Sequence, residues 1–340
     1  LLRILNSTSE AAMKLKISTL AIYLLLLIIL PSCNENKGKR IRVLFDTDTN
    51  NELDDQHALA YLLMNDDVFD VEAVTVNATS SGGGIEEQYA EAKRIMRLVG
   101  KLGSCPLLKG ADRNYEEIRV TLEEEYYDGY DAVEYIIERA KAVKEEKLFI
   151  IAVGKLTNIA LALEKAPEIS NKIKVIWLGS NYPDPGEYNL VNDIEAMNFV
   201  LSTDVPFEMA LVRYGKEDGT DAVRVTQAEI RQRMANTGHQ LKASITGRDG
   251  GEYFNFGDYS ISLFEHIKLH GPDLSRALFD MAAVAIVKNP GWAQKEEIPA
   301  PYYENDAWTI YPNNSRTITL WKHFDRNAIV EDFFATVSEK

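Results

Sequence analysis

The sequence predicts an α/β protein in which a mostly parallel sheet is flanked by helices. Apolar stretches of five or six residues recur at 41–45, 71–76 and 148–153, with the β-branched content of strands. A segment with helical apolar spacing follows the second of them, at 85–99. Because strands that alternate with helices are typical of βαβ units, we expect parallel pairing and a site at the carboxyl ends of the strands.

The remaining elements follow the same alternation. Predicted strands lie at 41–45, 71–76, 148–153, 174–178, 207–211 and 316–322, and predicted helices at 56–63, 85–99, 131–144, 159–163, 193–201, 280–287 and 328–337. Between 226 and 279 helix signals dominate, and Thr226-Gln-Ala-Glu229 fits a capping box. The aromatic residues Tyr253, Phe254, Phe256 and Tyr259 either belong to a loop that covers a pocket or pack in the core, and packing is the more typical role at any single position.

Composition restricts the class of partner. The chain has 340 residues, of which 46% are hydrophobic and 26% charged, so it can bury a substantial core. Its formal net charge of −15 argues against a nucleic-acid polymer as partner, because binding to phosphates needs a basic surface. Small cations and neutral or basic small molecules are compatible with this charge.

The N-terminal region has the pattern of an export signal. A basic segment, Met13-Lys-Leu-Lys16, precedes an apolar stretch at 17–30 that is short for a membrane span, which indicates a signal peptide at 13–32. Leu30-Pro-Ser-Cys33 resembles the lipobox of bacterial lipoproteins, which implies lipidation of Cys33, a tether at 33–40 and export to a bacterial membrane, on its periplasmic or cell-surface side. Residues 1–12 are then an upstream extension. Cys105 has no predicted disulfide partner.

Five carboxylates crowd the loop after the first predicted strand: Asp46, Asp48, Glu52, Asp54 and Asp55. Two like charges about 4 Å apart repel by roughly 4 kcal/mol at an effective dielectric constant near 20. A solvated acidic loop would tolerate this, but the apolar strand just before the loop favours a site for a hard cation such as Ca²⁺ or Mg²⁺. The N-terminus of the next helix adds partial positive charge beside the last two.

Two alternatives for this loop are less favourable. An EF-hand needs Gly at its sixth position and Glu at its twelfth, where this chain has Asn51 and His57, so we exclude it. Phe45-Asp-Thr-Asp-Thr49 resembles the first motif of haloacid-dehalogenase-type phosphatases. Those enzymes also need a lysine and a late acidic pair at strand ends. The chain has no convincing lysine, and Asp280 follows no predicted strand.

Four motifs follow one another with the order and spacing of a known family. They are Asp46-x-Asp48 with Asp54-Asp55, Gly154-Lys-Leu-Thr-Asn-Ile-Ala160, Gly186-Glu-Tyr-Asn189 ahead of Asp193-Ile-Glu-Ala196, and Asp280 at the start of an Ala-Val-Ala helix. Together they resemble the inosine–uridine-type nucleoside hydrolase family, from the first strand almost to the C-terminus. The resemblance implies one Rossmann-like domain over 41–340 that uses Ca²⁺ to hydrolyse ribonucleosides to ribose and free base.

The resemblance also implies a role for each site residue. Ca²⁺ would be held by Asp48, Asp55, the backbone carbonyl of Thr157 and Asp280. Asp48 would in addition be the general base for a metal-bound water, with Asp46 as a supporting carboxylate. The ribose hydroxyls would be bound by Asp54, Asn181, Glu187 and Asn189. The partner would be a small-molecule nucleoside, and a homodimer or homotetramer is compatible with the resemblance.

The chain departs from the family pattern at three points. Five residues, 49–53, separate Asp48 from Asp54 where three are usual. Phe279 stands where many members have the histidine that protonates the leaving base, and it either stacks on the base or packs in the core. The family has an asparagine after the second strand, and in this chain that position is either Asn77 or Ser80.

The sequence leaves two further questions open, the role of two histidines and the class of function. His266 and His270 lie four positions apart on a predicted helix and could bind a metal or reach the pocket, although such a pair is more typical of a surface or of packing. A different class of function is a non-catalytic nucleoside- or ribose-binding lipoprotein that retained the Ca²⁺ site.

Overall fold

The computed structural model describes residues 39–338. The predicted upstream extension, the signal peptide and the lipidation site Cys33 lie outside the described residues. Within the described part, none of the helices has the length and apolar character needed to cross a membrane.

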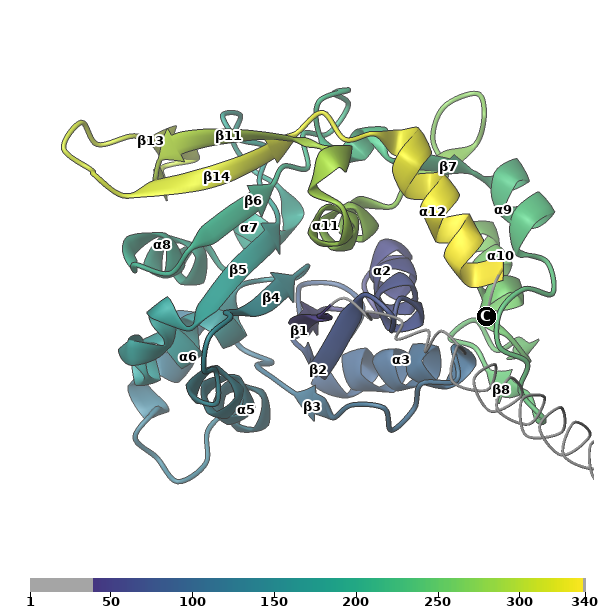
Figure 1. Ribbon diagram of the computed structural model, residues 1–340, viewed down its shortest axis with the longest axis horizontal. Helices are drawn as coiled ribbons and strands as arrows, with labels where there is room; N and C mark the ends of the chain where they lie inside the picture. Colours follow the sequence, from purple (N-terminus) through teal and green to yellow (C-terminus); the bar gives the residue numbers. More distant parts are fainter. Residues whose placement is uncertain (1–38, 339–340) are drawn as a thin grey trace, which may run out of the picture. The chain divides into compact units, whose positions relative to one another are not determined.

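A central sheet of eight strands organises the described residues (Figure 1). In spatial order its strands are β11 (Gln294–Pro299), β14 (Thr317–Lys322), β6 (Phe207–Ala210), β5 (Ile173–Leu178), β4 (Leu148–Ala152), β1 (Ile41–Thr47), β2 (Phe69–Val76) and β3 (Leu107–Lys109). All neighbouring strands pair in parallel except β11, which runs antiparallel to β14 at one edge. The predicted α/β class with a mostly parallel sheet is therefore confirmed.

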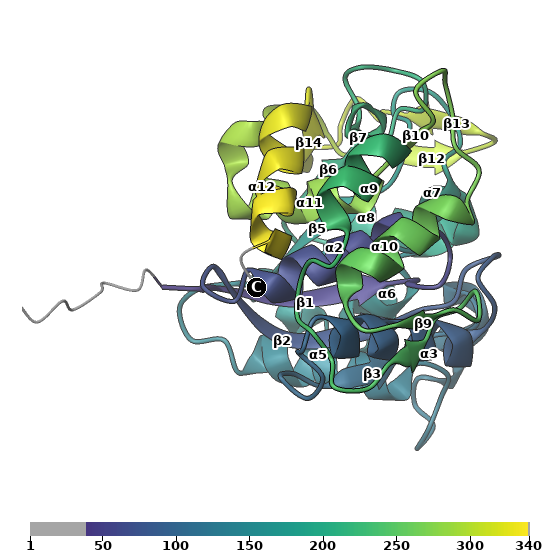
Figure 2. The same cartoon turned by 90° about the vertical axis from the view of Figure 1, so that its right-hand side faces the viewer.

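Helices cover both faces of the sheet, as side-chain alternation along β1 requires. Val43 and Phe45 face a core shared with α2 (Asp54–Met64), α3 (Ile85–Leu98), α9 (Gln227–Met234), α10 (Phe256–Glu265), α11 (Phe279–Lys288) and α12 (Arg326–Ser338). Leu44 faces a second core shared with α4 (Tyr115–Ile118), α5 (Tyr130–Lys141), α6 (Thr157–Lys165) and α8 (Ile194–Ser202). Figure 2 looks onto the side where α9, α10 and α12 lie.

Short elements complete the described chain. They are α7 (Tyr188–Asn192), the 3₁₀ turns 119–121, 167–171, 220–222 and 290–292, and the strand pairs β7 (Arg224–Thr226) with β10 (Ser275–Ala277), β8 (Ile245–Thr246) with β9 (Glu252–Tyr253), and β12 (Tyr302–Glu304) with β13 (Ala307–Thr309). The capping box at Thr226 is present, and it begins α9. Asp280 does follow a short strand, β10, but that strand lies outside the central sheet.

Of the two interpretations of the aromatic residues at 253–259, packing in the core is confirmed for Phe256 and Tyr259. Phe256 and Tyr259 lie in α10 and are fully buried in the core, so their role is packing. Phe254 is exposed, and Tyr253 in β9 packs against the same core. The sequence also did not indicate β11, because Gln294, Lys295, Glu296 and Glu297 are exposed on this edge strand.

Candidate active site

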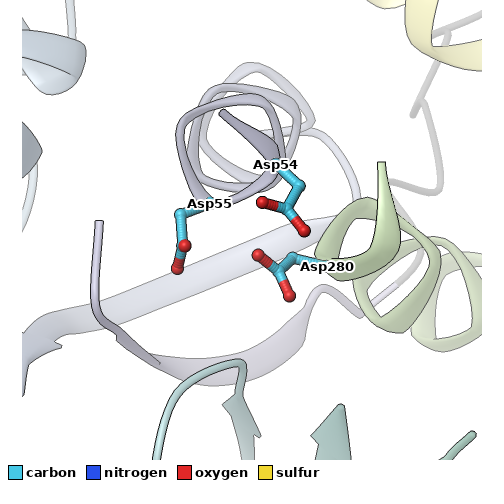
Figure 3. Close-up of side chains that lie close together, drawn as sticks. All are labelled: Asp54, Asp55 and Asp280. Carbon is cyan, nitrogen blue, oxygen red and sulfur yellow. The ribbon is translucent and has the colours of Figure 1, made fainter. Parts of the chain in front are cut away.

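Three carboxylates converge at the carboxyl edge of the sheet. Asp54 and Asp55 belong to the first turn of α2 and Asp280 to the first turn of α11, and these two helices pack together. Each residue offers a carboxylate oxygen, and these oxygens lie within 4.8 Å of one another (Figure 3). All three side chains are buried. Residues more than 200 positions apart thus meet at one point, as the motif analysis predicted for Asp55 and Asp280.

Burial and, to a lesser extent, mutual repulsion raise the pKa values of these carboxylates. Burial, with repulsion from neighbouring carboxylates, raises the pKa of Asp54 to about 7 and raises that of Asp55 and Asp280 well above the usual range. A divalent cation would relieve both effects, and carboxylate oxygens are the ligands that hard cations prefer. The residues present therefore fit a hard divalent cation.

Asp48 lies directly after β1 and beside this group. Its Oδ2 accepts a hydrogen bond from the Thr79 hydroxyl, while its buried Oδ1 has no partner among the described residues. Burial raises the pKa of Asp48 to about 6. A Cβ atom at Gly154 would lie 2.9 Å from Oδ1, so glycine there leaves room for the carboxylate. Thr79 was not identified from the sequence, although it lies in the polar segment after the second strand.

Asp46 is a structural junction beneath Asp48. Its carboxylate accepts hydrogen bonds from Thr75 Oγ1 at 2.6 Å, Asn77 Nδ2 at 2.7 Å and Asn158 Nδ2 at 2.7 Å. Of the two candidates after β2, Asn77 is therefore the one buried within the site. Ser80 lies outside it and is exposed, and its backbone N–H donates to Asn192 Oδ1 at 2.7 Å.

Glu187 and Asn189 are held at the start of α7. The Glu187 carboxylate accepts backbone hydrogen bonds from Ser180 at 2.9 Å and from Asn189 and Leu190 at 3.0 Å, while burial raises its pKa. Asn189 Nδ2 donates to the carbonyls of Val153 and Leu178 at 2.9 and 3.1 Å. Both side chains are thus fixed before any ligand arrives.

A cavity of about 410 Å³ unites these groups. Among the predicted site residues, its wall includes Asp48, Asp54, Asp55, Glu187, Asn189, Phe279 and Asp280. Asn181 is not among the described residues that line it, and its Oδ1 accepts from the backbone N–H of Tyr214 at 3.2 Å. Thr157 begins α6, and its hydroxyl donates to Asp193 Oδ2 at 2.5 Å, so the prediction for Thr157 rests on its carbonyl alone.

Further lining residues were not assigned to the site from the sequence, among them Tyr214, Arg224, Arg276 and His270. Tyr214 meets Phe279 edge to face, with ring centroids 5.7 Å apart. Arg224 and Arg276 contribute basic side chains, and His270 lies beside Arg276. His266 instead ends α10 and bonds back to the Ser262 carbonyl at 2.8 Å, so the two histidines do not share a helix as predicted. Only His270 of that pair lines the cavity.

Comparison of the sequence with known proteins found a matching family and similar proteins. The sequence model of the family described as inosine-uridine preferring nucleoside hydrolase matches residues 43–324. The chain is 26% identical to the pyrimidine-specific ribonucleoside hydrolase RihA of Citrobacter koseri over 231 residues, which are 60% of this chain and 68% of that protein. It is 31% identical to an uncharacterised protein of Schizosaccharomyces pombe over 105 residues, which are 29% of this chain and 34% of that protein.

Solved structures share the fold. A plant nucleoside hydrolase superposes with a TM-score of 0.68 at 17% identity, covering 88% of this chain and 99% of that one. An inosine-uridine preferring nucleoside hydrolase from Bacillus anthracis gives 0.63 at 17% identity, with 88% and 100% covered. A purine-preferring ribonucleoside hydrolase from Gardnerella vaginalis gives 0.62 at 20% identity, with 88% and 98% covered. At these identities the likeness concerns the fold alone.

Proposed function

Because the match to the family model spans residues 43–324, the chain belongs to the inosine-uridine preferring nucleoside hydrolase family, whose members are enzymes, and we propose that it uses Ca²⁺ to hydrolyse ribonucleosides to ribose and a free base. The observation that carries this proposal is the convergence of the buried Asp54, Asp55 and Asp280 in a cavity that also contains Asp48. The same cavity has aromatic walls at Tyr214 and Phe279, which suit a flat base.

Ca²⁺ would be held by Asp55 and Asp280, with Asp48 and the carbonyl of Thr157 as further ligands. The support for this set is the burial of the three carboxylates and their raised pKa values, which a bound cation would reverse. When bound, the ion would orient the attacking water and make it more acidic. Asp54 lies within the same group of oxygens, so it is close enough to act at the ion or at the sugar.

Asp48 would accept the proton of the attacking water. Its Oδ1 is the buried oxygen that lacks a protein partner, and Thr79 already holds its Oδ2. Asp54, Glu187 and Asn189 would bind the ribose hydroxyls, and the nearby carboxylates would stabilise positive charge that develops on the sugar as the glycosidic bond breaks.

A reducing-sugar assay across common nucleosides, with and without a Ca²⁺ chelator, tests the proposal. We expect Asp48→Asn to lower kcat by at least about 100-fold, because a positioned general base contributes at least that factor. Binding of Ca²⁺, followed by calorimetry, should persist in this variant. The exposed Asp67→Asn serves as the matched control.

Two outcomes would replace the proposal. Binding of nucleosides without release of ribose from any of them by the wild type would favour the non-catalytic binding protein. Hydrolysis of a phosphate ester with Mg²⁺ would favour the phosphatase alternative.

We also propose that the protein is exported and anchored to a bacterial membrane through a lipid on Cys33. The support is the basic and apolar segment before Leu30-Pro-Ser-Cys33. Metabolic labelling with a fatty acid should mark the full-length protein and fail in the Cys33→Ala variant. Equal labelling of the two would overturn this proposal without affecting the enzymatic one.

A further inference from the structure

The departing base presents a chemical problem in this cavity. When the bond from the ribose to the base nitrogen breaks, the electron pair goes to the base, which leaves as an anion unless it is protonated or stabilised. Phe279, at the start of α11, has no proton to give. A donor for the leaving base must therefore come from elsewhere in the wall, and its basic members among the described residues are Arg224, His270 and Arg276.

Arg276 is the best positioned of these three. It lies in β10, three residues before Phe279, and its side chain is only 14% exposed. Its Nη2 forms an ion pair with the Glu52 carboxylate, and its Nη1 donates to His270 Nε2 at 3.0 Å. Its buried Nε has no partner among the described residues, and an arginine with an unpaired donor is stabilised when it gains an acceptor.

The position of Glu52 suggests why the acidic loop is longer than in the family pattern. It lies within residues 49–53, where the chain has two more residues than the family pattern. Arg248 Nη1 donates to the carbonyls of Asn50 and Glu52 at 3.2 and 3.1 Å, which fixes this part of the loop from outside. The lengthened loop thus brings the Glu52 carboxylate to Arg276, in the segment that precedes Asp280.

His270 and Arg224 are less suited to the task. An arginine side chain can only donate, so His270 Nε2 accepts from Arg276 and is not available as a donor to the base. Arg224 Nη2 is paired with Asp221 Oδ1 at 2.6 Å, and Asp221 Oδ2 accepts from the Gly215 backbone at 2.8 Å.

We propose that Arg276 is the residue that stabilises the leaving base, with Glu52 and His270 as its positioning residues; this rests on the proposed nucleoside hydrolase function. As the glycosidic bond breaks, its electron pair passes to the base nitrogen. The guanidinium of Arg276 donates hydrogen bonds to the nitrogen or oxygen atoms that take up the negative charge. The proton that Asp48 removes from water reaches the base afterwards through solvent, so charge and atoms balance.

The test compares two kinds of leaving group in the full-length enzyme with Ca²⁺. Uridine and inosine need help as the base departs, whereas 4-nitrophenyl riboside releases a phenolate that is stable without it. We expect Arg276→Gln to lower kcat/KM for the nucleosides by about 100-fold and for the nitrophenyl riboside by less than about tenfold, as for loss of one preorganised donor. Arg276→Lys, which keeps the charge, should recover part of the loss. The exposed Arg231→Gln is the matched control.

The positioning residues have their own readout. Glu52→Gln should lower kcat for nucleosides more than it changes KM, and should leave the nitrophenyl riboside nearly unaffected. Equal losses on both substrates in Arg276→Gln would overturn the proposal. If Arg276→Gln fails to fold, losses on both substrates in Arg276→Lys would overturn it instead. The proposal would also be overturned if His270→Gln, but not Arg276→Gln, lost the fall in nucleoside hydrolysis at high pH. Wild-type enzyme that releases neither ribose nor nitrophenol would instead refute the proposed function.

Discussion

Asn158 donates a hydrogen bond from Nδ2 to Oδ2 of Asp46 across 2.7 Å, which joins the first turn of α6 to the end of β1. The same amide also serves two other segments. Its Nδ2 lies 3.2 Å from the Val76 carbonyl at the end of β2, and its Oδ1 accepts from the backbone of Ala111 at 2.8 Å. Because Asp46 is only two residues before Asp48, Asn158 contributes, with Thr75 and Asn77, to the position of the candidate base.

Replacement of Asn158 by alanine is therefore expected to destabilise the fold. It leaves buried donors and acceptors without partners, each at about 1–3 kcal/mol, so the free energy of unfolding should fall by at least about 2 kcal/mol. Urea unfolding followed by circular dichroism measures this. The exposed Asn327→Ala is the control. A change of less than about 0.5 kcal/mol in Asn158→Ala, the range typical of surface substitutions, would show that Asn158 does not join these segments.

Some residues of the site could be predicted from the sequence and others could not. Asp48, Asp54, Asp55 and Asp280 could be predicted because each follows a strand or begins a helix within a recognisable motif. Arg276 could not, since it lies in no motif and its partner Glu52, in the acidic loop, is 224 positions away. Their contact depends on how the lengthened loop folds back, which side-chain packing decides.

A similar limit applies to the fold. The central strands β1, β4 and β5 were predictable because both of their faces are covered, which requires continuous apolar stretches. The edge strand β11 buries little beyond Ile298, so its sequence resembles a polar loop. In α10 the aromatic side chains of Phe256 and Tyr259 enter the core, and no local pattern distinguishes this from a loop over a pocket.

Gly154→Ala should impair catalysis while it preserves the fold. The added Cβ would lie 2.8 Å from Asn77 Oδ1 and 2.9 Å from Asp48 Oδ1, so both side chains must shift. A displacement of a catalytic group by about 1 Å can cost about 100-fold in rate, and we expect a fall of that order in kcat with little change in the unfolding midpoint. In the control Gly84→Ala, the nearest atom is a side-chain oxygen of Asp112 at 3.3 Å. Full activity in Gly154→Ala would show that Asp48 tolerates the displacement.

The stabilising effect of Ca²⁺ should grow as pH rises. Burial raises the pKa of Asp48 to about 6 and of Asp54 to about 7 from 3.8, so the metal-free folded protein retains protons that the unfolded chain releases above about pH 4. Its stability is therefore greatest at low pH and falls as pH rises through these values, by about 3 kcal/mol for Asp48 alone. Ca²⁺ replaces the protons and removes this loss.

Urea unfolding at pH 5, 6 and 7, with Ca²⁺ or with a chelator, measures the difference. His57, whose pKa burial lowers to about 4, has the opposite pH dependence, but it affects both series equally and cancels. The Asp280→Asn variant should show a smaller Ca²⁺ effect at pH 7. Stabilisation by Ca²⁺ that is the same at pH 5 and pH 7 would indicate that these carboxylates do not bind the ion.

Phe279→Leu decides whether this side chain stacks on the base or only packs. Its ring lines the cavity and meets Tyr214 edge to face, which leaves it placed to contact a flat ligand. An aromatic pair adds about 0.5–1.5 kcal/mol beyond area burial, so loss of a stacking contact should raise KM by about 2- to 12-fold. The rise should be larger for purine nucleosides, whose bases offer more area, than for pyrimidine nucleosides. The exposed Phe254→Leu is the control, and a loss of stability with an equal KM change for both classes would assign Phe279 to packing.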